Sequence, residues 1–248
     1  MDLSRRNRAH FVVFAGQSNM LGHRLAIDGD KPEPERVFAW NNEGEQGRWR
    51  PARLGRQPFN PSPGSPNNPA LHFAARLSEG TGTPVFLVGC PINGSSIVSW
   101  QDEQAENMAR LLTQVRFAVN SERMRRLQIE NADAFLWLQG ESDDPLATMV
   151  TAPRVTTLDE YRRAFRSMKE TLHRQPWWNG AKFIAGTPVT DGWLSARSDF
   201  YNLSEGIDAV VSSEGLGHVG DRAHFNGEAL QVLGERMYKA YAALATAP

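Results

Sequence analysis

The chain has 248 residues, a formal net charge of −1 at pH 7, 40% hydrophobic residues and 22% charged residues. This composition is typical of a globular protein. A charge near zero gives no electrostatic reason to expect nucleic acid or an anionic membrane as a partner. No segment approaches the roughly 18 consecutive apolar residues of a membrane span. We expect a single domain over residues 1–248, with residues 1–9 as a flexible N-terminal tail.

The chain contains one cysteine, Cys90, which excludes an intramolecular disulfide and any metal site built from several cysteines. The N-terminal residues lead directly into a short apolar stretch. They lack the longer apolar region and the small-residue cleavage site of a signal peptide. These features favour a cytoplasmic location.

Five short apolar runs are continuous rather than alternating, which is typical of strands buried on both faces of a parallel sheet. They are Phe11–Ala15, Val85–Val88, Ala134–Leu138, Phe183–Ala185 and Ala209–Val211. Longer amphipathic stretches between them predict helices over Pro69–Ser78, Asp102–Arg126 with a break near Asn120, Leu158–Arg174 and Asn226–Leu244. The alternation predicts an α/β fold with a mostly parallel, five-stranded sheet and helices on both faces.

Two segments lack any periodicity. Residues 41–68 are rich in Pro, Gly, Asn and Arg, and residues 144–157 contain two prolines and several threonines. Loops this long in a compact domain are usually functional or disordered. Ligands of doubly wound sheets bind at the carboxyl ends of the strands, and we expect both segments to shape ligand choice at that edge.

A serine-containing run, Gly16-Gln17-Ser18-Asn19-Met20, follows the first predicted strand. It places Ser18 on the turn that leaves the sheet, close to backbone N–H groups. Taken alone, a serine at such a point is more often a helix N-cap than a nucleophile.

The run Asn93-Gly94-Ser95-Ser96 follows the second predicted strand. Gly94 lets the backbone approach a ligand closely and offers its N–H to a developing oxyanion. A tight turn in which a following serine caps a helix explains this run equally well.

A dense polar cluster, Gln139-Gly140-Glu141-Ser142-Asp143, follows the third predicted strand. Polar side chains at the mouth of a buried strand cost desolvation energy unless they are paired, which favours a site here. Gln139 has an amide that can donate to an oxyanion. Glu141 and Asp143 can orient neighbouring loops by accepting backbone hydrogen bonds.

Asp221 and His224 lie three residues apart just before the last predicted helix. One turn can present both side chains, so that the carboxylate accepts from one imidazole nitrogen while the other nitrogen faces a nucleophile. Histidine has an unperturbed pKa of about 6.5, which suits a general base near neutral pH. Standing alone, the pair is better explained as a helix-capping Asp with a surface His.

Together the four blocks supply a nucleophile, an oriented base and oxyanion donors at one sheet edge, as acyl transfer requires. Two other classes compete with this interpretation. A carbohydrate-binding or interaction module could keep the fold without turnover. A flavodoxin-like nucleotide binder would need a glycine-rich phosphate loop after the first strand, and residues 17–20 do not form one.

The blocks resemble those of the SGNH (GDSL-like) hydrolase superfamily, and within it the branch of sialate O-acetylesterase-like proteins and family 6 carbohydrate esterases. Gly-Gln-Ser-Asn at 16–19, Gln-Gly-Glu-Ser-Asp at 139–143 and Asp-x-x-His at 221–224 match the motifs of that branch in the same order. The resemblance extends from Phe11 to about Leu244. Gln17 stands where the wider superfamily has the Asp of Gly-Asp-Ser.

The resemblance implies a flavodoxin-like, three-layer α/β/α hydrolase that removes acyl groups, usually acetyl, from carbohydrate hydroxyls without a metal or other cofactor. Ser18 would be the nucleophile, His224 the base and Asp221 its orienting group. The oxyanion hole would consist of the Ser18 N–H, the Gly94 N–H and the Gln139 side chain, with Gly89 as a rival to Gly94.

The remaining site residues are expected to support this centre. Gln17, Asn19, Glu141 and Asp143 would scaffold the loops, and His23, five residues after Ser18, could line the pocket. No histidine pair has a metal-ligand spacing such as His-Glu-x-x-His, so we expect no metal. The expected partner is a small-molecule or glycan ester, and acetylated xylan, acetylated sialic acid and other small esters all fit.

Overall fold

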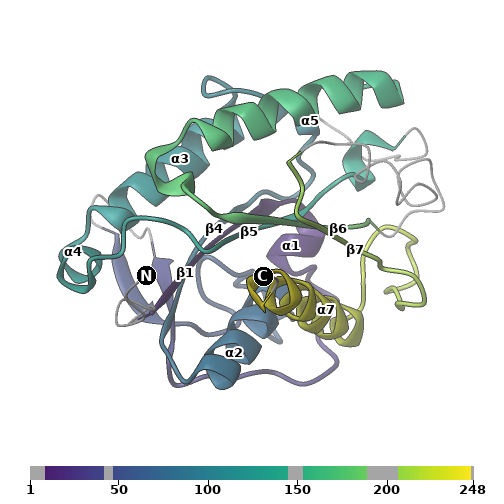
Figure 1. Ribbon diagram of the computed structural model, residues 1–248. Coiled ribbons are helices and arrows are strands. Elements are labelled where there is room, and N and C mark those ends of the chain that lie inside the picture. The colour runs from purple at the N-terminus through teal and green to yellow at the C-terminus, as the bar shows by residue number, and fades with distance from the viewer. Residues whose placement is uncertain (1–8, 42–46, 145–152, 189–205, 247–248) are drawn as a thin grey trace.

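The computed structural model describes residues 9–41, 47–144, 153–188 and 206–246. Within these residues, seven strands form one sheet in the order β3-β2-β4-β1-β5-β6-β7 (Figure 1). They are β1 (His10–Gly16), β2 (Val37–Asn41), β3 (Arg48–Pro51), β4 (Val85–Pro91), β5 (Ala134–Leu138), β6 (Lys182–Gly186) and β7 (Ala209–Val211). Neighbouring strands are parallel, except that β3 pairs with β2 in the antiparallel direction.

Helices cover both faces of the sheet, so that the protein has three layers (Figure 1). The α-helices are α1 (Ser18–Leu21), α2 (Pro69–Thr81), α3 (Glu106–Val119), α4 (Glu122–Leu127), α5 (Leu158–His173) and α7 (Gly227–Thr246). Short 3₁₀ helices are η2 (Ile97–Trp100), η3 (Glu141–Asp143) and η4 (Pro176–Trp178). Helices α2 and α7 pack on one face, while α3, α4 and α5 pack on the other.

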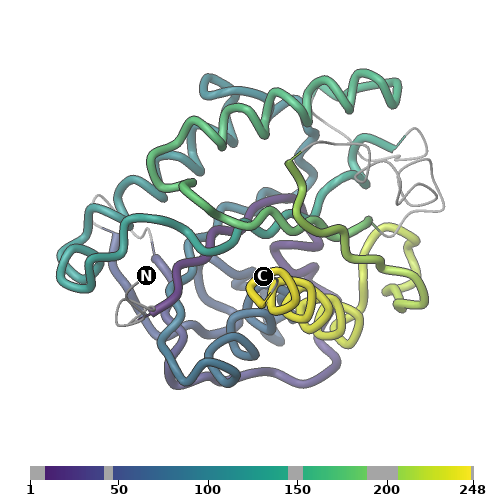
Figure 2. The backbone as a smooth tube through the Cα atoms, in the orientation of Figure 1, coloured from purple at the N-terminus to yellow at the C-terminus, as the bar shows by residue number. Residues whose placement is uncertain are grey.

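Strand β1 runs through the middle of the sheet, as the purple segment of Figure 2 shows. All of its seven residues are buried. Phe11 and Val13 belong to the core cluster beneath α3 and α5, and Val12 and Phe14 belong to the cluster beneath α2 and α7. Because successive side chains point to opposite faces and both faces are covered, the strand has a continuous apolar sequence.

The α/β sandwich predicted from the sequence is confirmed, but the predicted number of five strands is wrong. The two additional strands are β2 and β3, and β3 lies within the segment 41–68 that was expected to be irregular. Its sequence is Arg-Trp-Arg-Pro, and its side chains are exposed or half-buried. An edge strand tolerates charge and proline because one of its sides makes no sheet hydrogen bonds, so its composition does not reveal it.

The predicted break near Asn120 is confirmed, because α3 ends at Val119 and the Ser121 side chain caps α4. Helix α3 begins later than expected. Asp102 Oδ1 accepts the N–H groups of Gln104 and Ala105, which holds a turn before the helix. The expected tail at residues 1–9 lies outside the described residues except for Ala9, which is buried against the core and belongs to the fold.

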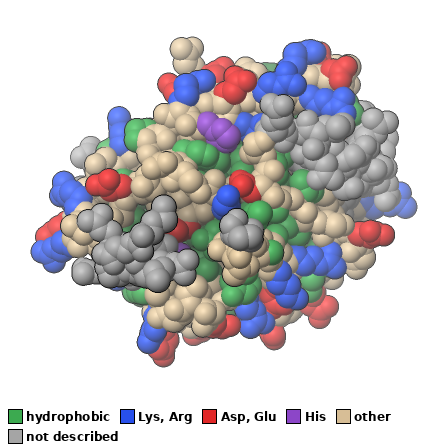
Figure 3. Space-filling model, in the orientation of Figure 1, with side chains coloured by type: hydrophobic (Ala, Val, Ile, Leu, Met, Phe, Trp, Pro, Cys, Tyr) green, Lys and Arg blue, Asp and Glu red, His purple; other side chains and the backbone are tan. Residues whose placement is uncertain are grey.

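The surface carries mixed charge. Over the described part of the face in Figure 3, basic and acidic side chains are interspersed rather than gathered by sign. None of the described helices is both long and apolar enough to cross a bilayer.

The carboxyl ends of β1, β4 and β5 are joined closely at one edge of the sheet. The Gln17 N–H donates to the Leu138 carbonyl at 3.0 Å, and the Ile92 N–H donates to the Gly16 carbonyl at 2.9 Å. Gly16 has a φ of +138°, and a Cβ there would lie 2.0 Å from the Leu138 carbonyl oxygen. A side chain at this position would therefore push β1 and β5 apart just before Ser18.

Replacing Gly16 with alanine should lower the free energy of unfolding by at least about 3 kcal/mol. Backbone strain of about 1–3 kcal/mol adds to an overpacking cost of similar size. Gly82→Ala is the matched control, because Gly82 also has a positive φ, +66°, but a Cβ there meets nothing within 4 Å. It should lose only about 1–2 kcal/mol. Urea unfolding measures both, and equal losses would contradict the close approach at Gly16.

Candidate active site

Ser18, His224 and Asp221 form one hydrogen-bonded chain at this edge of the sheet. His224 Nε2 lies 2.9 Å from Ser18 Oγ, and His224 Nδ1 lies 2.6 Å from Asp221 Oδ2. Ser18 is the first residue of α1 and is 3% exposed, whereas the side chains of His224 and Asp221 are 22% and 42% exposed. The structure thus brings together the three side chains expected to be catalytic, from opposite ends of the chain.

Asp221 organises the turn that carries His224. Its Oδ1 accepts the N–H groups of Ala223 and His224 at 3.0 and 2.9 Å, while Arg222 adopts a left-handed φ of +60°. The Val219 N–H donates to the His224 carbonyl at 2.9 Å. Partial burial raises the pKa of Asp221, but the hydrogen bonds from the His224 ring and from the two N–H groups outweigh it and lower this pKa to about 2. The carboxylate is therefore ionised at neutral pH and accepts a hydrogen bond from the Nδ1–H of His224, which directs the Nε2 lone pair towards Ser18.

Asn19 clamps the backbone on both sides of His224. Its Nδ2 donates to the Ala223 carbonyl at 2.9 Å, and its Oδ1 accepts the Phe225 N–H at 3.0 Å. The same Nδ2 donates to Glu141 Oε1 at 2.5 Å. Because Asn19 and Glu141 are buried, these bonds fix the His224 segment to the first and third sequence blocks.

Gln17 joins the first block directly to the third. Its side-chain oxygen accepts the N–H groups of Gly140 and Ser142, both at 3.2 Å, and the residue is 3% exposed. Gln17 therefore holds the start of the loop after β5 against the end of β1.

Asp143 holds the Gly94 loop against the third block. It accepts from Ser96 Oγ at 2.5 Å, from the Ile97 N–H at 2.8 Å and from Gln139 Nε2 at 2.6 Å. Burial raises the pKa of Asp143, and these hydrogen bonds oppose that rise. The side chain therefore links two loops rather than facing a substrate.

The Gln139 amide does not offer a free N–H in this arrangement, contrary to the oxyanion role expected of it. Its Nε2 donates to the Ser95 carbonyl at 3.1 Å and to Asp143, and its Oε1 accepts from Tyr161 Oη at 2.7 Å. The side chain is fully buried. An amide nitrogen carries two hydrogens, and both have protein acceptors here. Gln139 therefore positions the loop that carries Gly94.

The backbone N–H groups of Ser18 and Gly94 remain as candidate oxyanion donors. Neither makes a hydrogen bond to another described residue. Gly94 has a φ of +67° and open space where a Cβ would be. Gly89, the rival donor, lies within β4, where a Cβ would be 2.0 Å from the Phe14 ring. Glycine is needed at this position because it leaves room for the Phe14 ring in the sheet.

His23 stacks on the base. The rings of His23 and His224 are parallel within 15°, with centroids 3.8 Å apart. With Asp221 they form a group whose ligand atoms lie within 4.8 Å of one another. A tetrahedral zinc site needs lone pairs that converge on one point, whereas parallel rings direct their in-plane lone pairs along separate planes. The stack thus fits support of His224 better than metal ligation.

Ser96 caps η2, as one of the two serines expected to cap a helix there, whereas Tyr161, Asn60 and Asn68 were not expected at the site. Tyr161 lies on the buried face of α5, where only its bond to Gln139 distinguishes it from a core residue. Asn60 and Asn68 bind carbonyl groups at the end of α1. The asparagine content of segment 41–68 was a signal, but nothing in the sequence indicates which asparagines reach the site.

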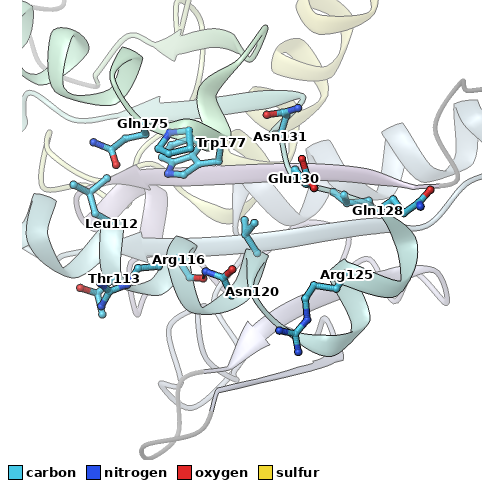
Figure 4. A pocket seen from close by; sticks show the side chains of 13 residues that line it. Leu112, Thr113, Arg116, Asn120, Arg125, Gln128, Glu130, Asn131, Gln175 and Trp177 are labelled. Carbon is cyan, nitrogen blue, oxygen red and sulfur yellow. Dashed lines mark hydrogen bonds between the residues drawn. The ribbon is translucent and has the colours of Figure 1, made fainter.

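A cavity of about 520 Å³ lies at the end of α1 and the carboxyl end of β4. Leu21, three residues after Ser18, and Asn93, next to Gly94, are among its lining residues. A larger cavity of about 850 Å³ lies at the amino ends of β5 and β6, with Arg116, Asn131 and Trp177 in its wall (Figure 4). That edge of the sheet is opposite to the one that carries Ser18, so the smaller cavity is the candidate substrate pocket.

Solved structures of similar fold include a protein from Arabidopsis thaliana, at 17% identity and a TM-score of 0.67, with 94% of this chain and 98% of that chain covered. A carbohydrate acetylesterase from Xanthomonas citri has 16% identity and a TM-score of 0.57, covering 93% of this chain and 55% of its own. A carbohydrate acetylesterase family member from Sinorhizobium meliloti has 13% identity and a TM-score of 0.50, covering 93% and 96%. At these identities the similarity shows a shared fold.

The chain matches the family described as carbohydrate esterase, sialic acid-specific acetylesterase, over residues 8–243. No curated protein matches it significantly. The protein belongs to this carbohydrate esterase family, whose activity is the hydrolysis of ester bonds, and the resemblance found in the sequence is confirmed.

The Asn19 clamp can be tested by changing one atom. Asn19→Asp replaces the donating NH₂ with an oxygen that faces Glu141 and the Ala223 carbonyl. We expect kcat to fall at least about 10-fold, because His224 loses its fixed position, while KM changes little. Adding Glu141→Gln, whose amide can donate to the new carboxylate, should recover part of the loss. Wild-type kcat in the single variant would contradict the clamp.

Proposed function

We propose that this protein is a serine esterase that removes acyl groups, acetyl in particular, from carbohydrate hydroxyls through an acyl-enzyme intermediate. The observation that carries this proposal is the hydrogen-bonded chain Ser18–His224–Asp221. A cavity of about 520 Å³, within the range of small-molecule sites, lies at the same sheet edge and is lined by Leu21 and Asn93 among others.

In the first half-reaction, His224 Nε2 removes the proton of Ser18 Oγ as this oxygen attacks the acyl carbonyl carbon. The carbonyl oxygen becomes an oxyanion, and the Ser18 and Gly94 N–H groups donate to it. The tetrahedral intermediate then collapses. The bond from the acyl carbon to the sugar oxygen breaks, and His224 gives its proton to that oxygen.

In the second half-reaction, water takes the place of the sugar hydroxyl. His224 removes a proton from water, whose oxygen attacks the acyl carbon bound to Ser18. Collapse of the second intermediate breaks the bond to Ser18 Oγ, which regains a proton from His224, and the carboxylic acid leaves. The Asp221 carboxylate stabilises the imidazolium formed in each half-reaction.

Substitution of the three side chains should give graded losses. Ser18→Ala and His224→Ala are expected to lower kcat for p-nitrophenyl acetate at least about 10⁴-fold. Asp221→Asn should lose less than His224→Ala, because the imidazole and its path to Ser18 Oγ remain. Ser78→Ala is the matched control. Ser78 is also a buried serine, on α2, whose Oγ bonds the Thr83 carbonyl away from the site.

Near-wild-type activity in a folded Ser18→Ala protein would remove Ser18 from the mechanism. If Ser18→Ala retained glycan binding while the wild-type protein released no acid from any ester, the chain would be a binding module of the same fold.

The size of the pocket should determine which acyl chain lengths the enzyme hydrolyses best. We expect kcat/KM for p-nitrophenyl esters to fall from acetyl to butyryl and longer chains, because Leu21 and the loop after β4 wall the cavity. A panel of acetylated glycans, with acetate measured as product and Ser18→Ala as the blank, tests the leaving group. Preference for long acyl chains would contradict the proposed acetylesterase specificity.

A further inference from the structure

The mechanism above uses His224 and Asp221 but leaves His23 without a role. The His23 ring covers one face of the His224 imidazole at a centroid distance of 3.8 Å. Its Nδ1 is buried and makes no hydrogen bond within the described part of the chain. A polar atom buried without a partner is unfavourable, so packing on His224 accounts for the position of this ring better than its own hydrogen bonds do.

The backbone that presents His23 is held tightly. Gly22 ends α1 with a φ of +94°, and a Cβ there would lie 2.5 Å from a backbone oxygen of the neighbouring loop, so the turn requires glycine. Asn60 Nδ2 donates to the Gly22 carbonyl at 2.6 Å, and Asn68 Nδ2 donates to the Met20 carbonyl at 2.6 Å. The His23 carbonyl accepts the Ala26 N–H at 2.8 Å. These bonds fix the ring in place over the base.

The charges around His23 keep it neutral when His224 is protonated. Burial lowers the pKa of His23, and the positive charge of His224 lowers it further. Asp221 raises this pKa and Arg24 lowers it. A second positive charge on a ring stacked 3.8 Å from a protonated His224 is unfavourable. During the reaction, the proton taken from Ser18 therefore stays on His224.

We propose that His23 is a positioning residue for the base, a neutral aromatic ring whose face holds the His224 imidazole in the plane that points Nε2 at Ser18 and stabilises the imidazolium by stacking. This role rests on the proposed function. A fixed ring plane keeps Nε2 within hydrogen-bond reach of Oγ, and a π face attracts a cation placed against it.

The absence of a hydrogen bond at Nδ1 makes the proposal specific, because it requires the flat ring of His23 and not its nitrogen atoms. His23→Phe retains an aromatic face, His23→Ala removes it, and His23→Lys places a permanent positive charge beside His224. His173→Ala is the matched control. His173 also packs on an aromatic ring, that of Trp178 at 4.9 Å, but it lies on α5 away from the site.

The experiment measures kcat and KM for p-nitrophenyl acetate from pH 5 to 9 in these variants and in Ser18→Ala. His23→Ala should lose about 10-fold in kcat with KM within about 2-fold, and His23→Phe should recover kcat to within about 3-fold of wild type. In His23→Lys the fixed charge disfavours the His224 imidazolium, so the base stays neutral to lower pH. The acid limb of kcat/KM should move down by about one pH unit or more.

Three results would overturn the proposal. The first is a wild-type kcat in His23→Ala. The second is a raised KM at unchanged kcat in His23→Phe, which would show that a His23 nitrogen binds substrate. The third is an acid limb of kcat/KM that does not move in His23→Lys. Wild-type activity in Ser18→Ala would instead overturn the proposed function. Thermal unfolding tests whether each variant is folded, and His173→Ala shows the effect of losing an imidazole that packs on an aromatic ring elsewhere.

Discussion

The site depends on one constraint, which is that polar groups buried at the mouth of a parallel sheet must all find hydrogen-bond partners. Gln17, Asn19, Gln139, Glu141 and Asp143 are all buried where β1 and β5 end. Leaving one such group unpaired costs about 1–3 kcal/mol. Their partners include backbone groups of the loops that carry Gly94 and His224 and of the loop after β5. Satisfying the buried amides and carboxylates therefore also assembles the Ser18–His224–Asp221 chain.

The same constraint distinguishes the residues that hold the site in place from the groups that can react with a substrate. The buried side chains of Asn19, Gln139 and Asp143 have their polar atoms committed to protein partners, so they hold the geometry of the site. In the proposed mechanism, the groups that meet the substrate are Ser18 Oγ, His224 Nε2 and the backbone N–H groups of Ser18 and Gly94. His23 belongs to neither set. It is half-buried, makes no side-chain hydrogen bond to the described residues and acts through its ring face.

Much of this could be predicted from the sequence, because strand periodicity and short motifs are local properties. The run after β1, the block after β5 and the Asp221–His224 turn are each visible in a few residues. The role expected for Gln139 was wrong because its partners, Ser95 and Tyr161, come from other elements. Strand β3 was missed because only its pairing with β2 makes it a strand. The His23 stack depends on Asn60 and Asn68, which lie in a loop with no periodic signal.

The central claim is that Ser18 is an activated nucleophile, and covalent labelling tests it most directly. A fluorophosphonate reacts with a serine oxygen only when a neighbouring base activates it, and peptide mass spectrometry locates the adduct. The account predicts a single adduct on Ser18 in the wild-type protein, and a labelling rate at least about 100-fold lower in His224→Ala. An adduct on another residue, or esterase activity that persists while Ser18 stays unlabelled, would contradict it.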